Sequence, residues 1–71
     1  MLDPRLLRAF VAIADSGSFT IAAQRLHMTQ STISQQLGRL EQAVGHVLVD
    51  RAARPVRPTA AGERLLGHAR R

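Results

Sequence analysis

Apolar residues recur at helical spacing along two long stretches of the chain. Between residues 4 and 15 they stand close to three or four apart, at Leu6, Leu7, Phe10, Val11, Ile13 and Ala14. Between residues 30 and 44 the same spacing runs through Ile33, Leu37, Leu40 and Val44. Residues three and four apart share one face of an α-helix. We therefore predict helices over 4–15 and 30–44, each with one buried face.

Residues that favour helix ends flank both stretches. Asp3 is a good N-terminal cap, Pro4 suits a first helical turn, and Thr29 can cap the helix over 30–44. Gly17 and Gly45 follow the two stretches, and glycine readily adopts the left-handed conformation that ends a helix. The sequence thus predicts where both helices begin and end.

A shorter helix is predicted between these two. Ser18 is its expected cap, it ends near His27, and its expected buried residues are Ala22, Ala23 and Leu26. Only a short turn then separates it from the helix over 30–44. Two helices joined by a turn of three or four residues form a helix-turn-helix unit.

The pattern changes after residue 45. The short runs 47–49 and 56–58 flank a turn at residues 52–55, and two prolines limit any ladder between the runs. We predict a small hairpin whose edge carries arginine at every third position, at Arg51, Arg54 and Arg57.

A last helix is expected after the hairpin. Thr59 is its expected cap, and its apolar side holds Ala61, Leu65, Leu66 and Ala69. This helix is hardly complete at residue 71. We therefore expect a folded unit over 1–58, followed at 59–71 by the start of a longer helix.

The composition bounds the fold and excludes several functions. With 71 residues, of which Leu, Ile, Val and Phe make up 19, the chain can form one small domain. It has no Cys, Trp or Tyr, which excludes disulfides, thiol catalysis, Cys-based zinc sites and an aromatic base-stacking platform. Neither a membrane-spanning run nor a secretory signal is present, so we expect the protein in the cytosol.

The chain is strongly basic. Ten arginines oppose five acidic residues, which gives a net charge of +5 and favours polyanions, nucleic acid before an anionic membrane. The polar side of 30–44 lacks bulk and negative charge near its start, as a helix that enters the major groove of DNA requires. We predict DNA contacts by Ser18, Thr29, Gln30, Ser31, Thr32, Ser34, Gln35, Gly38, Arg39, Arg51, Arg54 and Arg57.

The residue types in this set suit different parts of a duplex. The amides of Gln30 and Gln35 can pair with N6 and N7 of adenine. The hydroxyls of Ser31, Thr32 and Ser34 suit base edges or phosphates, and the positive end of the helix attracts a phosphate near residues 29–30. The hairpin arginines suit phosphates and the adjacent minor groove.

The pattern supports neither catalysis nor metal binding. His27, His46 and His68 are scattered without the spacing of metal ligands. Asp15, Ser16 and His27 are the residue types of a catalytic triad, but nothing in the sequence orients them. We therefore expect no catalytic residue, metal or cofactor in these 71 residues.

Two other classes of function stay open. The chain could be a protein-interaction module that dimerises through its last helix without binding DNA. It could also be a basic amphipathic peptide on a membrane surface. A membrane-surface peptide is disordered in buffer, whereas three capped helices with a shared core predict a folded domain.

The order of motifs resembles a known family. The chain contains Ser18-Phe19-Thr20-x-Ala22-Ala23-x-x-Leu26, Gln30-Ser31-x-x-Ser34-x-x-Leu37-x-x-Leu40-Glu41-x-x-x-Gly45, Leu48-Val49-x-Arg51 and Thr59-x-x-Gly62. Together these motifs are similar to the N-terminal domain of LysR-type transcriptional regulators. The chain departs from the common pattern of that family at Ser31, Gln35, Gly38 and Val49.

The resemblance implies a mainly α, winged helix-turn-helix domain of a bacterial regulator. The wing is the hairpin at residues 47–58, and the DNA is a partly palindromic promoter in the cytoplasm, associated with the nucleoid. The helix from Thr59 would be a linker that joins homodimers or tetramers through Leu65, Leu66 and Ala69. A larger C-terminal domain, absent from this chain, would bind a small-molecule inducer.

Overall fold

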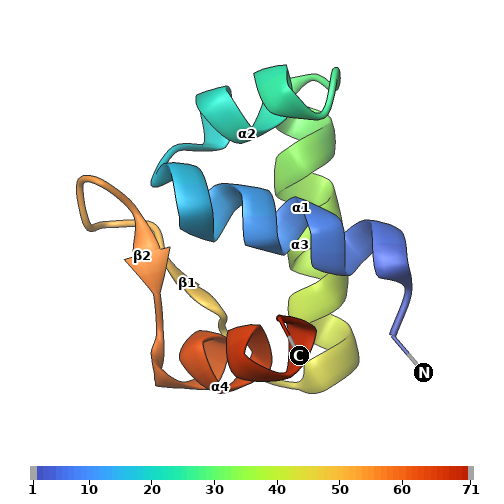
Figure 1. The fold of residues 1–71 in the computed structure, drawn as a ribbon, viewed down its shortest axis with the longest axis vertical. Coiled ribbons are helices and arrows are strands. Elements are labelled where there is room, and N and C mark those ends of the chain that lie inside the picture. Colours follow the sequence, from blue (N-terminus) through green and yellow to red (C-terminus); the bar gives the residue numbers. More distant parts are fainter. Residues whose placement is uncertain (1, 71) are drawn as a thin grey trace.

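The computed structural model describes residues 2–70 as four helices and a two-stranded antiparallel hairpin (Figure 1). In chain order the elements are α1 (Pro4–Ser16), α2 (Phe19–Arg25), α3 (Gln30–Val44), β1 (Val49–Asp50), β2 (Arg57–Pro58) and α4 (Ala60–Ala69). Helix α1 crosses α3, and α2 lies beside the first half of α3 (Figure 1). Helix α4 lies near the end of α3, and the hairpin stands between α2 and α4 (Figure 1). The predicted helix over 30–44 is confirmed, and the one predicted over 4–15 continues to residue 16.

The apolar faces of the helices form the core. Phe10 and Ile13 of α1 meet Ile33, Leu37 and Leu40 of α3, and all five side chains are fully buried. The small residues of α2 and the first residues of the hairpin close this core from two sides, through Ala22, Ala23, Leu48 and Val49. The helical spacing seen in the sequence therefore identified the core face of both long helices.

The predicted N-terminal caps, and the glycines predicted to follow α1 and α3, are confirmed. Each N-terminal cap accepts a hydrogen bond from a backbone N–H in the first turn, from Arg5 to Asp3, Ile21 to Ser18, Thr32 to Thr29, and Gly62 to Thr59. Gly17 and Gly45 have φ angles of 68° and 76°, the left-handed conformation that glycine adopts without a steric cost.

Helix α2 ends earlier than predicted. The prediction placed its end near His27, but the last helical residue is Arg25 and His27 already has a left-handed φ of 55°. The N–H of Met28 then donates to the carbonyl of Ala23 over 2.9 Å, which closes the turn between α2 and α3. The chain must reverse direction before Thr29. Residues 26 and 27 take part in this reversal and are not helical, although the apolar spacing extends the helix to them.

The hairpin is shorter than the two predicted runs. Val49 pairs with Pro58 and Asp50 with Arg57, while Val47 lies outside the sheet with 65% of its surface exposed. The N–H of Val56 donates to the carbonyl of Gly17 over 3.0 Å instead of to β1. The second strand therefore begins only at Arg57, because the residue before it is bonded to the turn after α1.

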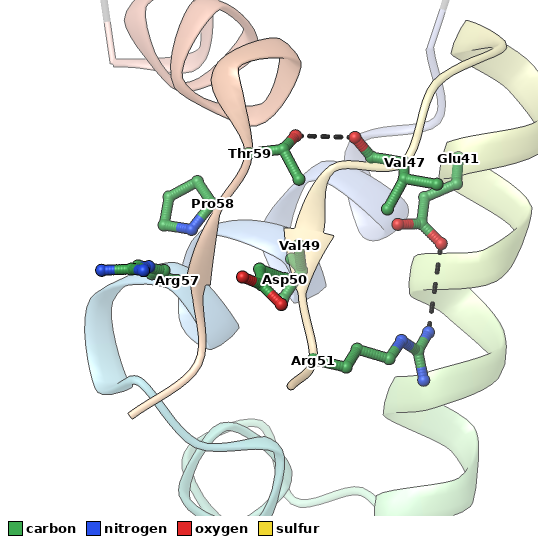
Figure 2. A pocket seen from close by; sticks show the side chains of 8 residues that line it. All are labelled: Glu41, Val47, Val49, Asp50, Arg51, Arg57, Pro58 and Thr59. Carbon is green, nitrogen blue, oxygen red and sulfur yellow. Dashed lines mark hydrogen bonds and ion pairs between the residues drawn. The ribbon is translucent and has the colours of Figure 1, made fainter. Parts of the chain in front are cut away.

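Helix α4 packs onto the hairpin and the core. Its Leu66 is buried, and Gly62 lies against Leu48 and Pro58. The N–H of Thr59 donates to the carbonyl of Leu48 over 3.0 Å, and its hydroxyl donates to the carbonyl of Val47 over 2.6 Å (Figure 2). Residues 60–69 thus belong to the same packed body as the helix-turn-helix and its wing.

Candidate nucleic-acid interface

The side of α3 opposite the core is polar and open to solvent. Ile33, Leu37 and Leu40 face inward, and Thr32, Ser34 and Gly38 are half-buried. The exposed residues of α3 that the sequence singled out are Gln30, Ser31, Gln35 and Arg39. Every predicted contact residue on α3 therefore lies at least partly at the surface.

A cleft lies between the start of α2, the first half of α3 and the wing. Five of the predicted DNA-contacting residues line it together, namely Ser18, Gln30, Ser34, Arg51 and Arg54. The remaining lining residues are Gly17, Phe19, Thr20 and Val56. The structure thus brings predicted residues from three elements into one concave surface, which we call the arginine cleft.

Arg51 is the most connected side chain of the arginine cleft. Its Nη1 donates to the hydroxyl of Ser34 over 3.0 Å, and its guanidinium carbon lies 4.9 Å from the centre of the Phe19 ring. Its Nη2 is 4.0 Å from Oε1 of Glu41, the contact drawn in Figure 2. Arg51 therefore lies across the surface of α3 instead of extending from the tip of the wing.

The three wing arginines do not share one edge, contrary to the interpretation of their spacing. Arg51 reaches α3, whereas Arg57 points to the opposite side of the hairpin in Figure 2. Arg54 turns back on its own loop, where its Nη1 donates to the carbonyls of Arg51 and Ala53. Residues between the strands form a turn, so the spacing of three brings Arg51 and Arg54 to the arginine cleft but leaves Arg57 on the other side of the hairpin (Figure 2).

Hydroxyl groups cluster around the start of α3. The hydroxyl of Thr20 donates to Oε1 of Gln30 over 3.3 Å, and that of Thr29 donates to the hydroxyl of Thr32 over 2.8 Å. The hydroxyl oxygens of Ser31 and Thr29 form a further hydrogen bond of 3.2 Å, in which either can be the donor. The first turn of α3 therefore offers several polar groups beside its unpaired backbone N–H groups, where an anion is favoured.

Two side chains that support the arginine cleft, Phe19 and Thr20, are not among the residues predicted from the sequence. Phe19 carries the guanidinium of Arg51, and Thr20 bonds to Gln30. Both follow Ser18 directly in the family motif, and that motif was the only signal for them in the sequence. Apolar spacing alone assigns Phe19 to the core, where it is only half-buried.

Arg39 lies apart from the arginine cleft, toward the start of α1. The pKa of Asp3 is lowered mainly by the side chain of Arg5, which donates a hydrogen bond to the Asp3 carboxylate. The positive charge of Arg39 contributes a smaller lowering of the same pKa.

The three predicted dimer residues differ in exposure. Leu66 is buried in the domain's own core, Leu65 is half-buried, and Ala69 is exposed. Leu65 also lines a hollow with Val44, Leu48 and Ala61, beside His46, Arg64 and His68. In this conformation Leu65 and Ala69 are available to a second copy, whereas Leu66 is not.

Two of the three side chains considered for catalysis, Asp15 and Ser16, have other partners. Asp15 forms an ion pair with Arg70, and the hydroxyl of Ser16 donates to the carbonyl of Ser18 over 2.9 Å. Among residues 2–70 there is no group of three or more His, Asp or Glu side chains that could hold a metal ion. Over the same residues, no helix is long and apolar enough to cross a membrane.

Gly38 has open space where a side chain would stand. No atom lies within 4 Å of the position of its missing Cβ, although the residue is in the middle of α3. We expect Gly38→Ala to raise the free energy of unfolding by up to about 1 kcal/mol, because alanine loses less backbone entropy in a helix. Urea denaturation checks this value.

Gly45→Ala is the matched control for that substitution. Its Cβ would also meet no atom within 4 Å, but its φ of 76° strains a residue with a side chain. We expect it to lower the free energy of unfolding by about 1–2 kcal/mol. A loss of stability in Gly38→Ala of the same size would contradict the open space at residue 38.

Comparisons with known proteins agree with this architecture. Residues 4–63 match the family described as "Bacterial regulatory helix-turn-helix protein, lysR family". The HTH-type transcriptional activator AllS of Klebsiella pneumoniae is 47% identical over 70 residues, which are 99% of this chain and 26% of AllS. The small neutral protease regulatory protein of Streptomyces coelicolor is 51% identical over 69 residues, 97% of this chain and 21% of that protein. The chain thus spans about a quarter of AllS and about a fifth of the Streptomyces protein.

Two similar solved structures contain DNA. The BenM_DBD/benA site 1 DNA complex superimposes with a TM-score of 0.91 at 38% identity, over 96% of this chain and 76% of that one. The CbnR_DBD–DNA complex gives a TM-score of 0.90 at 40% identity, over 97% and 79%. The arrangement of the four helices and the hairpin is therefore shared with both DNA-binding domains.

Proposed function

The chain belongs to the lysR family of bacterial regulatory helix-turn-helix proteins, and from this premise we propose that it binds double-stranded promoter DNA sequence-specifically through α3 and the wing. The single observation that carries the proposal is the arginine cleft. It joins the polar first half of α3 to Arg51 and Arg54 of the wing. Basic side chains therefore flank a helix that has no acidic residue in its first turn. The DNA complexes of the similar BenM and CbnR domains support the same assignment.

The two parts of this surface take different roles. Exposed amides and hydroxyls of α3, at Gln30, Ser31 and Gln35, contact base edges in the major groove. Arg51 and Arg54 at the arginine cleft, and Arg57 on the other side of the wing (Figure 2), contact phosphates or the adjacent minor groove, which positions the domain on the duplex. The positive N-terminal end of α3, capped by Thr29, adds attraction for a phosphate.

The longer protein acts as a homodimer or tetramer on a partly palindromic site. Leu65 and Ala69 of α4 face the second copy, and two copies of α3 enter successive major grooves about 34–36 Å apart. A further domain binds a small-molecule inducer, while residues 1–71 use no cofactor and catalyse no reaction. The site of action is the cytoplasm, at the nucleoid.

The test combines selection with salt dependence. Bound sequences are selected from a randomised duplex pool, and the dissociation constant of the selected duplex is measured from low to physiological salt. We expect a preferred sequence, and a log–log slope of binding against salt of about −0.9 for each phosphate neutralised.

Two results would contradict the proposal. An affinity that is unchanged between low and physiological salt would exclude phosphate contacts by the wing. Concentration-dependent oligomers without any DNA affinity would favour the protein-interaction module that dimerises through α4.

A further inference from the structure

Glu41 is an acidic residue on the side of α3 that faces the wing. Ser34 and Glu41 follow Gln30 by four and eleven residues. This spacing places all three along one side of the helix. Only 17% of the Glu41 side chain is exposed. A carboxylate that is largely withdrawn from water requires a specific partner.

The two oxygens of Glu41 have different partners. Oε2 accepts a hydrogen bond from the N–H of Leu48 over 2.8 Å, which ties α3 to the residue before β1. Oε1 lies 4.0 Å from Nη2 of Arg51 (Figure 2). Glu41 therefore contacts both the residue before β1, Leu48, and the arginine that follows β1, Arg51.

The guanidinium of Arg51 is contacted from three sides. Ser34 accepts from Nη1, Glu41 faces Nη2, and the Phe19 ring lies beneath the group. A guanidinium has five N–H donors, and 47% of this side chain stays exposed. Donors are therefore left for an anion, on a side chain that is already ordered before binding.

We propose that Glu41 is a positioning residue, which holds the Arg51 guanidinium across the arginine cleft in the orientation that contacts a DNA phosphate. The inference rests on the proposed function and deepens it. A carboxylate near DNA repels phosphates, so its removal by itself strengthens binding. If Glu41 positions Arg51, its removal instead weakens binding, because a released arginine must be ordered again when the phosphate binds.

The decisive variant is Glu41→Gln. The glutamine carbonyl can still accept the hydrogen bond from Leu48, so the wing remains tied to α3 while the charge opposite Arg51 is lost. We expect binding to a selected duplex and to a random duplex of equal length to weaken about threefold to tenfold.

Glu63→Gln provides the matched control. Glu63 is exposed in the first turn of α4 and forms no hydrogen bond or ion pair with Arg51, yet its substitution changes the net charge equally. We expect this variant to bind both duplexes as tightly as the wild type or more tightly. Thermal unfolding of both variants verifies that they remain folded.

A double-mutant cycle separates positioning from support of the fold. In an Arg51→Ala background, Glu41→Gln should no longer weaken binding, because no guanidinium is left to hold. Equal weakening in both backgrounds would show that Glu41 acts only through Leu48 and would overturn the proposal. Equal behaviour of Glu41→Gln and Glu63→Gln would overturn it as well.

A measurement without DNA keeps the test independent of affinity. Nuclear spin relaxation of the Arg51 side-chain Nε–H should show more motion in Glu41→Gln than in the wild type. In Glu63→Gln the motion of this group should equal that of the wild type. An unchanged Arg51 side chain in Glu41→Gln would overturn the positioning role alone. A wild-type protein that binds neither duplex would overturn the proposed function, and this inference with it.

Discussion

Replacement of Gly62 by alanine is expected to lower the free energy of unfolding by about 1–3 kcal/mol, the range observed for overpacked cores. A methyl group on Gly62 would overlap the carbonyl oxygen of Leu48 and lie 3.0 Å from Cβ of Pro58. Both neighbours belong to the hairpin, and the carbonyl is held by the N–H of Thr59. Helix α4 must therefore move outward, which exposes part of Leu66.

The loss is large for a domain of this size. Small domains are stable by only about 5–15 kcal/mol, and this one has a single small core. Alanine would otherwise stabilise a helix by up to about 1 kcal/mol relative to glycine, so the substitution tests the close contact directly. Urea denaturation of the wild type and the variant provides the measurement.

Gly67→Ala is the control within the same helix. No atom lies within 4 Å of its Cβ position, and the residue is exposed. We expect it to leave the stability unchanged or raise it by a few tenths of a kcal/mol, since it lies in the last turn of α4. If both alanine variants were equally stable, the contact between α4 and the hairpin would be looser than the structure shows.

Arg51→Ala is expected to weaken binding to every duplex, by about tenfold or more, since a charge-assisted hydrogen bond contributes about 1.5–3 kcal/mol. Phosphates carry no sequence information, so the selected and random duplexes should lose affinity alike. The salt slope should also become shallower by about one unit. Titrations of both duplexes at several salt concentrations check these expectations.

Gln30→Ala is the contrasting variant on α3. It should reduce the ratio between selected and random affinity by about 1–3 kcal/mol if the amide contacts a base edge. Thr20 already donates to Oε1 of Gln30, so this amide is partly ordered before it meets DNA. If Arg51→Ala and Gln30→Ala both altered only the random affinity, α3 would not be the helix that contacts bases.

Local signals in the sequence were sufficient for the starts of the four helices. Asp3, Ser18, Thr29 and Thr59 each cap a helix with a bond that spans two or three residues, so the residue type and its neighbours determine it. The apolar spacing likewise determines which face of α1 and α3 is buried. The family motif placed the polar side of α3 and Arg51 in one functional surface.

The sequence alone determined where each helix begins and which face it buries, whereas the tertiary structure decided what each face meets. Periodicity predicts that Leu66 is buried, but only packing shows that it is buried in its own domain. The bonds of Arg51 to Ser34 and of Val56 to Gly17 join residues 17 and 39 positions apart. Such contacts form because the core brings distant segments together, and no local pattern of residue types encodes that approach.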